Sequence, residues 1–108
     1  MGYIKHHAIV VISFDEELLK KAHRKAKKIF GEQVSKVMET PVNVEFTFYI
    51  GPDGSKEGWS ESDAGNAKRD EFIEWVEGQA YGDGSNSLRY SELFFGEDEN
   101  KSEVTRHN

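Results

Sequence analysis

The spacing of apolar residues predicts two β-strands in the first half of the chain. Residues 6–14 (HHAIVVISF) form a short continuous run rich in β-branched residues, which is typical of a central strand buried on both faces. Residues 42–50 alternate instead, with Val44, Phe46, Phe48 and Ile50 on one side. That period of two indicates a strand with one buried face.

A helical repeat separates these two strands. Apolar residues recur every three or four positions over residues 18–30, so we expect an amphipathic helix there. Ser13 and Glu16 have the spacing of a capping box at its start, and Gly31 is the expected C-cap. Residues 32–41 fit either a short strand or a turn of helix.

The second half repeats this order of elements. Gly51-Pro52-Asp53-Gly54 predicts a tight turn into a return strand over residues 55–59. A second helix follows, with Ser60 or Ser62 as its N-cap. Its apolar stripe is formed by Phe72, Trp75, Val76 and Gln79. An exposed loop over residues 82–87 then leads to a last strand over residues 88–95.

The resulting order, β-α-β-β-α-β, predicts an α+β fold of the ferredoxin-like kind, an antiparallel sheet with two helices on one face. We expect residues 1–95 to form a single domain and residues 96–108 to be a polar, flexible C-terminal tail with at most a short strand around Val104. The other face of such a sheet is uncovered. Because the first and last strands carry apolar residues on both sides, we expect a homo-oligomer through this open face.

Composition indicates where the protein is located and which classes of partner it does not bind. There is no cysteine, and no stretch approaches the roughly 20 apolar residues of a membrane span, so we expect a cytoplasmic protein that does not bind membranes. The formal charge of −6 disfavours direct nucleic-acid binding, which depends on Lys and Arg meeting phosphates.

Charge is unevenly distributed along the chain. Residues 20–28 carry six bases and no acid, so the rest of the chain carries −12. The bases suit the C-terminal half of a helix and could simply be a solvated surface. They could also form a docking surface for phosphates or for an acidic partner.

The turn and the start of the second helix are the first candidate binding site. Free amides at a helix N-terminus can hold a phosphate, and an indole ring can stack on a base. The candidate ligand-binding residues of this region are Ser55, Lys56, Trp59, Ser60, Ser62, Asn66 and Arg69. Neighbouring acids would repel an anion, and ordinary turn and cap chemistry explains the same residues.

Catalytic and metal chemistry have weaker support. His6 and His7 are adjacent on a strand and point to opposite faces, so they cannot chelate one metal; we expect no metal site and no cofactor. No carboxylate pair stands in an apolar setting that would separate two pKa values. His7, Arg89 and Tyr90 could meet at one end of the sheet as a ligand-binding or acid–base set.

The run from residue 42 to residue 76, with KHHAIVVISFDEELLKKAHRKAKKIF ahead of it, resembles a group of small uncharacterised proteins of bacteriophages and prophages. The likeness covers most of residues 4–95 and rests on PDGSKEGW, FIEW and the opening strand and helix. It implies a protein of the host bacterial cytoplasm, of the kind that counteracts host defence by binding. No catalytic residue is implied.

We therefore expect a non-catalytic binding protein, and its first candidate partner is a small nucleotide second messenger. An alternative is an acidic inhibitor that mimics nucleic acid and binds a host defence protein. Its acidic surface would comprise Asp70, Glu71, Glu74, Glu77, Glu97, Asp98 and Glu99. A third is a small enzyme acting on a phosphodiester.

Overall fold

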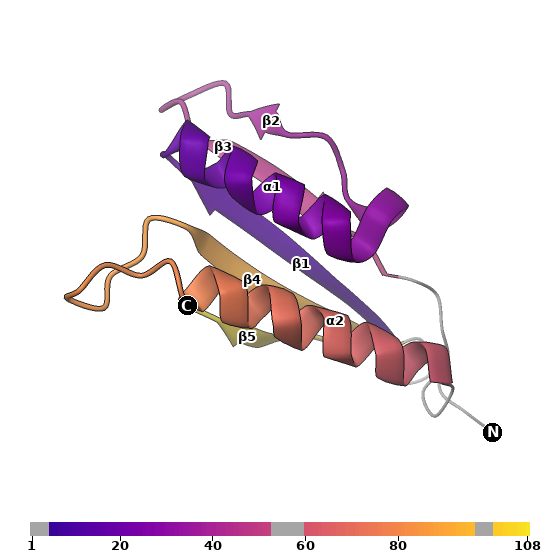
Figure 1. The fold of residues 1–108 in the computed structure, drawn as a ribbon. Coiled ribbons are helices and arrows are strands. Elements are labelled where there is room, and N and C mark those ends of the chain that lie inside the picture. Colours follow the sequence, from indigo (N-terminus) through magenta and orange to yellow (C-terminus); the bar gives the residue numbers. More distant parts are fainter. Residues whose placement is uncertain (1–4, 53–59, 97–100) are drawn as a thin grey trace.

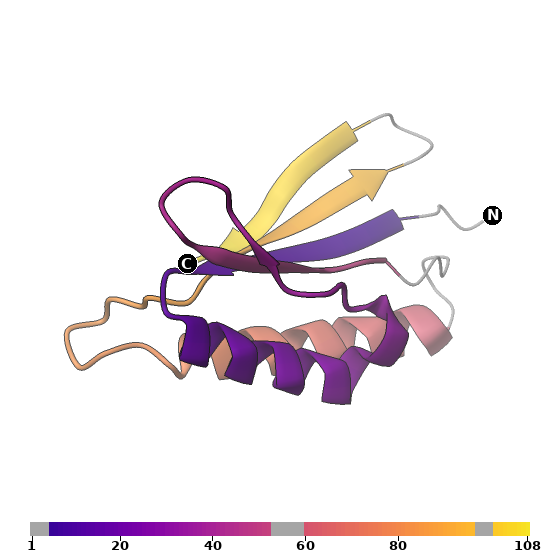
Figure 2. The ribbon, with the colours of Figure 1, turned by 90° about the horizontal axis from the view of Figure 1, so that it is seen from above.

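The computed structural model describes residues 5–52, 60–96 and 101–108 (Figure 1). Its elements in chain order are β1 (Lys5–Ser13), α1 (Glu16–Phe30), the short 3₁₀ helix η1 (Gly31–Gln33), β2 (Met38–Glu39), β3 (Phe46–Ile50), α2 (Ser60–Glu77), β4 (Arg89–Gly96) and β5 (Lys101–His107). The strands form one sheet in the order β2-β3-β1-β4-β5, with every neighbouring pair antiparallel. Both helices cover the same face of the sheet (Figure 2). The predicted α+β class is confirmed.

The core lies between the helices and the inward side of the three central strands. Paired residues of neighbouring strands point to the same face, and Val11 pairs with Phe48 on β3 and with Tyr90 on β4. All three are buried, as are Leu19 of α1 and Phe72 of α2 above them. Strand β1 is therefore the centre of the sheet, as its continuous apolar run predicts. The expected burial on both faces is wrong, because Val10 and Ile12 on the side away from the helices are only half-buried.

Helix α1 follows the predicted apolar face but begins differently. Leu19, Ala22 and Ala26 are buried on its inner side. Its N-cap is Asp15, whose carboxylate accepts a hydrogen bond from the Leu18 amide at 3.1 Å, so the predicted capping box of Ser13 and Glu16 is wrong. The Ser13 hydroxyl instead accepts from the Asp15 amide. A carboxylate at the N-terminus also interacts favourably with the helix dipole.

The C-terminus of α1 is as predicted. Gly31 has a φ of +63° and its amide donates to the Lys27 carbonyl, which is the expected role of a C-cap glycine.

The strand expected over residues 42–50 begins only at Phe46. Asn43 and Val44 have φ values of +66° and +37°, so the alternating pattern continues through a loop that is not extended. This loop joins β2 to β3. The ambiguous segment 32–41 contains the end of η1 and the short strand β2. The return strand expected over residues 55–59 lies outside the described residues.

Helix α2 packs Phe72 and Val76 into the core, as its stripe predicts, and Ile73 is buried beside them. Trp75 is half-buried and its ring stacks on Phe72 with centroids 6.4 Å apart. The helix ends at Glu77, so Gln79 lies beyond it. Within the described residues, no helix has the length and apolarity that crossing a membrane requires.

The C-terminal segment differs from the expected flexible tail. Residues 101–107 form β5, which pairs with β4 along its whole length and has one irregularity next to Glu92. Two side chains explain this order. Arg106 neutralises the buried Glu92 from the helix-facing side, and Val104 extends the apolar surface beside Leu93 on the other side.

Candidate binding site on the open sheet face

The face of the sheet that the helices leave uncovered is called here the open face. By register, its residues alternate with the core residues along each strand. They are Met38, Thr47, Tyr49, His6, Ala8, Val10, Ile12, Arg89, Ser91, Leu93, Phe95, Ser102, Val104 and His107. Several apolar members are well exposed, including Tyr49 at 44% and Val104 at 53%. The loop between β2 and β3 and the β4–β5 pair rise on this side of the sheet (Figure 2).

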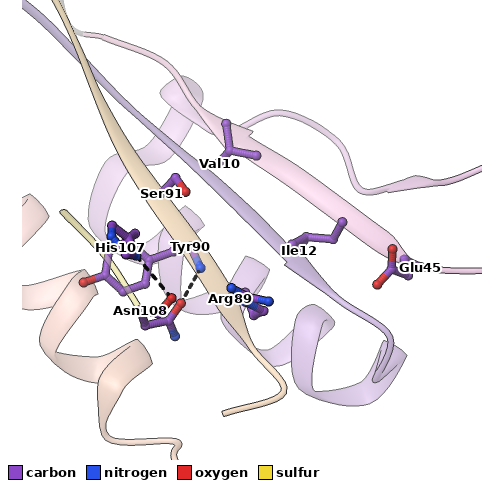
Figure 3. Close-up of a pocket in the computed structure, with 8 residues that line it drawn as sticks. All are labelled: Val10, Ile12, Glu45, Arg89, Tyr90, Ser91, His107 and Asn108. Carbon is purple, nitrogen blue, oxygen red and sulfur yellow. Dashed lines mark hydrogen bonds between the residues drawn. The ribbon is translucent and has the colours of Figure 1, made fainter. Parts of the chain in front are cut away.

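A hollow of about 370 Å³ lies on the open face, and we call it the open-face pocket (Figure 3). It is lined by Val10, Ile12, Glu45, Arg89, Tyr90, Ser91, His107 and Asn108. Arg89 and Ser91 come from β4 and His107 from β5, while Glu45 lies across β1, directly before β3 begins. The pocket is therefore built by three strands, Asn108 and the end of the β2–β3 loop, although its residues are far apart in the sequence.

The end of β5 is held in place by the last residue of the chain. The Asn108 side chain accepts a hydrogen bond from the Tyr90 amide at 3.0 Å and donates to the Leu88 carbonyl at 2.8 Å. Its amide group thus continues the ladder between β5 and β4 for one more step. These two hydrogen bonds of Asn108 hold the neighbouring His107 opposite Ser91 at the rim of the pocket.

The polar groups of the pocket suit an anion at one end and a hydrogen-bond donor at the other. Arg89 offers a guanidinium, His107 a ring nitrogen and Ser91 a hydroxyl. Neither Arg89 nor His107 forms an ion pair with any residue in the described part of the chain, so both can engage a ligand. Glu45 supplies acceptor oxygens on the other side of Ile12 (Figure 3).

Behind the pocket, on the side facing the helices, a charge network around the buried Glu92 holds β5 against β4 and α2. The Arg106 guanidinium donates to both carboxylate oxygens of Glu92 at 2.8 and 2.7 Å, and to Asp70 of α2 at 2.8 Å. Arg69 and the Thr105 hydroxyl also contact the Glu92 carboxylate. Because Arg106 and His107 are adjacent, this network sets the register of the strand that carries His107.

The network decides the protonation of Glu92. Burial alone would raise the pKa of its carboxyl, but hydrogen bonds from Arg106 and Thr105 and the charges of Arg106 and Arg69 outweigh burial, and the pKa is lowered. Glu92 is therefore ionised in the folded protein at neutral pH. Its role is structural, since its carboxylate faces α2 and not the pocket.

Tyr90 is buried on the same side. Its hydroxyl donates to Glu77 at 2.7 Å, and burial together with that carboxylate raises the pKa of the phenol. Tyr90 is among the residues that line the pocket, and its ring points toward α2 (Figure 3). It is a core residue that ties β4 to the end of α2.

The structure separates the set formed by His7, Arg89 and Tyr90. Arg89 lines the pocket on the open face, whereas Tyr90 points to the helix side. His7 lies toward the other end of β1, opposite Phe94, with the two ring centroids 5.4 Å apart. The three side chains therefore do not form one site, and an acid–base set built from them is wrong.

The predicted residues around the second helix that the structure describes lie on α2 and are not among the residues that line the open-face pocket. Asn66 is exposed and accepts a hydrogen bond from Arg69, whose guanidinium lies against Glu92. Ser60 and Ser62 belong to the first turn of α2. Ser55, Lys56 and Trp59 lie outside the described residues. Among the predicted ligand-binding residues whose side chains the structure describes, Arg89 and Tyr90 line the open-face pocket, and the Tyr90 hydroxyl is bonded to Glu77.

Sequence reasoning missed Glu45, Ser91, His107 and Asn108. Ser91 could have been found, because residues two apart on a strand share a face and Arg89 was already a candidate. His107 and Asn108 could not, since a polar C-terminus gives no local strand signal. Glu45 has the alternation of a strand residue and gave no hint of a ligand.

The basic surface of α1 is largely solvated. Lys20 pairs with Glu16 on the same helix at 2.8 Å, and Lys25 approaches Glu71 of α2 at 3.7 Å. Lys21, Arg24, Lys27 and Lys28 make no ion pair within the described ranges. No three His, Asp or Glu side chains gather as metal ligands within residues 5–52, 60–96 and 101–108.

Comparison with protein-family models, with curated proteins and with solved structures gave no match.

Proposed function

We propose that this protein is a non-catalytic binding protein whose open-face pocket holds a small phosphorylated ligand of the nucleotide class. The observation that carries the proposal is the convergence of Arg89, His107 and Ser91 on one hollow of the uncovered sheet face. A cation without an ion pair, next to further donors and an apolar floor, is the arrangement that recognises a phosphate attached to an organic body.

Each part of such a ligand has a counterpart in the pocket. The Arg89 guanidinium can take two phosphate oxygens at once, and His107 and Ser91 can donate to a third. Val10 and Ile12 form the apolar floor. Glu45, across β1, accepts from a sugar hydroxyl or a base amine. A hollow of about 370 Å³ is of the size that small-ligand sites have.

The setting follows from the resemblance to small phage proteins. There, a captured nucleotide would be a second messenger of host defence, and the protein would act by sequestering it. Nothing in this role requires turnover.

The order of the strands supports a finer description of the fold. The order β2-β3-β1-β4 with antiparallel neighbours and two helices on one face is what a ferredoxin-like sandwich has, and β5 adds one strand at its edge. We infer that the chain is a ferredoxin-like domain extended by β5.

A second candidate function is the acidic inhibitor. Helix α2 carries six acids and two bases, a formal charge of −4, and lies next to α1, which has the opposite charge. However, Asp70, Glu71 and Glu77 are engaged by Arg106, Lys25 and Tyr90. Partnered carboxylates offer less charge to a host protein than free ones, so the pocket is the better candidate.

Native mass spectrometry with a panel of cyclic and ADP-ribose-derived nucleotides tests the proposal. We expect one of them to be retained with its mass unchanged. Arg89→Ala should weaken retention at least about tenfold, because a charge-assisted hydrogen bond contributes roughly 1.5–3 kcal/mol. Lys27→Ala on α1 is the control and should retain the nucleotide as the wild type does. A ligand returned with altered mass would favour the enzyme, and retention of none would overturn the proposal.

A further inference from the structure

We propose that the open-face pocket is half of a site, and that a second copy of this chain packs against the open face and closes it. The inference rests on the proposed function for its ligand, while the dimer itself is argued from the exposed residues of the sheet.

The open face is too apolar to be an ordinary solvated surface. Met38, Tyr49, Phe95 and Val104 are between 41% and 65% exposed and share this face with the half-buried Val10 and Leu93. Four strand spacings of about 4.8 Å and a mean strand length of about six residues give it roughly 400 Å² in projection. Side-chain relief and the raised β2–β3 loop make the accessible area larger than this projection, and a standard interface buries about 800 Å² of accessible surface per partner.

Charge selects a second copy as the occupant. Glu45 and Arg89 lie on opposite sides of β1, next to Ile12 (Figure 3). Thr47 and Arg89 both pair with Ile12, and Glu45 lies two residues beyond Thr47. A twofold axis that runs above β1 and parallel to it therefore places Glu45 of one copy about two residues along the strand from Arg89 of the other, within reach of the two long side chains, and the same pair forms twice. Sheets packed with nearly parallel strand directions are a common arrangement, so this axis is sterically ordinary.

The loop between β2 and β3 fits the same arrangement. Val42 and Val44 are 70% and 58% exposed, and Val44 keeps a φ of +37° that a β-branched residue rarely adopts. The loop rises on the open side of the sheet (Figure 2). In the twofold arrangement it reaches the end of β4 and β5 in the partner, where Asn108 closes the ladder, and its valines become covered.

For the ligand, the consequence is a site between subunits. Arg89, Ser91 and His107 of one copy hold the phosphate, and the β2–β3 loop of the partner closes the pocket over it. The guanidinium of Arg89 has enough N–H groups to donate to the phosphate and to Glu45 of the partner at the same time. Water is excluded from the charged contacts, which strengthens them.

Sedimentation velocity over an about hundredfold range of protein concentration tests the dimer. We expect a concentration-dependent shift from monomer to dimer. Val104→Glu should weaken association at least about tenfold, because it would bury an unpaired carboxylate. Lys27→Glu on α1 is the matched control and should associate as the wild type does. Circular dichroism would confirm that both variants are folded.

A charge exchange makes the test specific for the proposed axis. Glu45→Arg and Arg89→Glu should each weaken the dimer, and the double variant should recover association because both pairs re-form with reversed charges. A wild type that stays monomeric throughout, or a Val104→Glu variant that dimerises normally, overturns the inference. A monomer that binds a nucleotide overturns the dimer alone; a dimer that retains none overturns the proposed ligand and leaves the dimer.

Discussion

The two faces of the sheet are made by alternate residues of the same strands, yet they serve different purposes. On the helix side, Ile9, Val11, Phe48 and Ile50 are at most 2% exposed and pack against α1 and α2. On the open side, their neighbours Val10 and Tyr49 remain in contact with solvent, and polar side chains gather at one end. One face holds the fold together, and the other is left available for binding.

Charge follows the same division. On the helix side, Arg106, Glu92, Asp70 and Arg69 are joined in one network, so no member is available to a ligand. On the open side, Arg89, His107 and Glu45 line a hollow and lie apart from that network. The charge network on the helix side stabilises the fold, whereas the charged side chains on the open side can bind a ligand.

Two adjacent residues of β3 give the largest test of this contrast. Phe48→Ala removes a ring packed edge-on against Phe72 and His23 and should lower the free energy of unfolding by about 3–5 kcal/mol. Tyr49→Ala, one residue further and on the other face, should cost about 1 kcal/mol or less in the monomer. Urea unfolding of both variants checks this, and equal losses would show that the faces do not differ.

The charge network should come next in size. Arg106→Met keeps an apolar stem but leaves Glu92 buried with Arg69 as its remaining cation, and should cost about 2–4 kcal/mol. Arg24→Met on the solvated side of α1 is the control and should change stability by less than about 0.5 kcal/mol. If the two variants unfold at the same urea concentration, the network does not hold β5.

Acid titration should reveal Glu92 directly. Because the folded-state pKa of its carboxyl is lowered from the ordinary value of 4.5, its contribution to stability is complete above that pH and is lost as the pH falls through the folded-state pKa. We expect the free energy of unfolding to decline below about pH 4.5 in the wild type. In Glu92→Gln, measured by urea unfolding at several pH values, the decline should be shallower; an unchanged slope would contradict this account.

The smallest expected effect separates folding from binding within one loop. Val44→Gly relieves the positive φ but frees the unfolded chain, so stability should stay within about 1 kcal/mol of the wild type. Dimerisation should nevertheless weaken, because an apolar contact with the partner is lost. Sedimentation and urea unfolding of this variant measure the two effects separately. Unchanged association would remove Val44 from the proposed interface.

Sequence patterns predicted the helix side of this protein better than the open side. The apolar repeat of residues 18–30 and the run in β1 are local signals of burial, and both elements are where they were expected. Strand β5 has no such signal, because it is ordered by Arg106 reaching Glu92 fourteen residues away in the chain. The loop at Asn43 and Val44 broke an alternation that looked like a strand.

The site was harder to predict than the fold for the same reason. The pocket depends on register, which brings Ser91 opposite His107 and places Glu45 across β1 from Arg89. Residue types alone pointed to His7 and Tyr90, but the side chains of both lie on the helix side of the sheet. The register of the paired strands determines which side chains face the helices and which line the pocket.

The most direct measurement is a map of backbone amide chemical shifts in the ¹⁵N-labelled protein during titration with ADP-ribose and, separately, with inorganic phosphate. The account predicts that shifts for both gather on Val10, Ile12, residues 89–91 and residues 107–108, and that ADP-ribose binds more tightly because it also meets the apolar floor and Glu45. Shifts that gather on the basic side of α1, or no saturable shift with either ligand, would contradict the claim that the open face is the binding face.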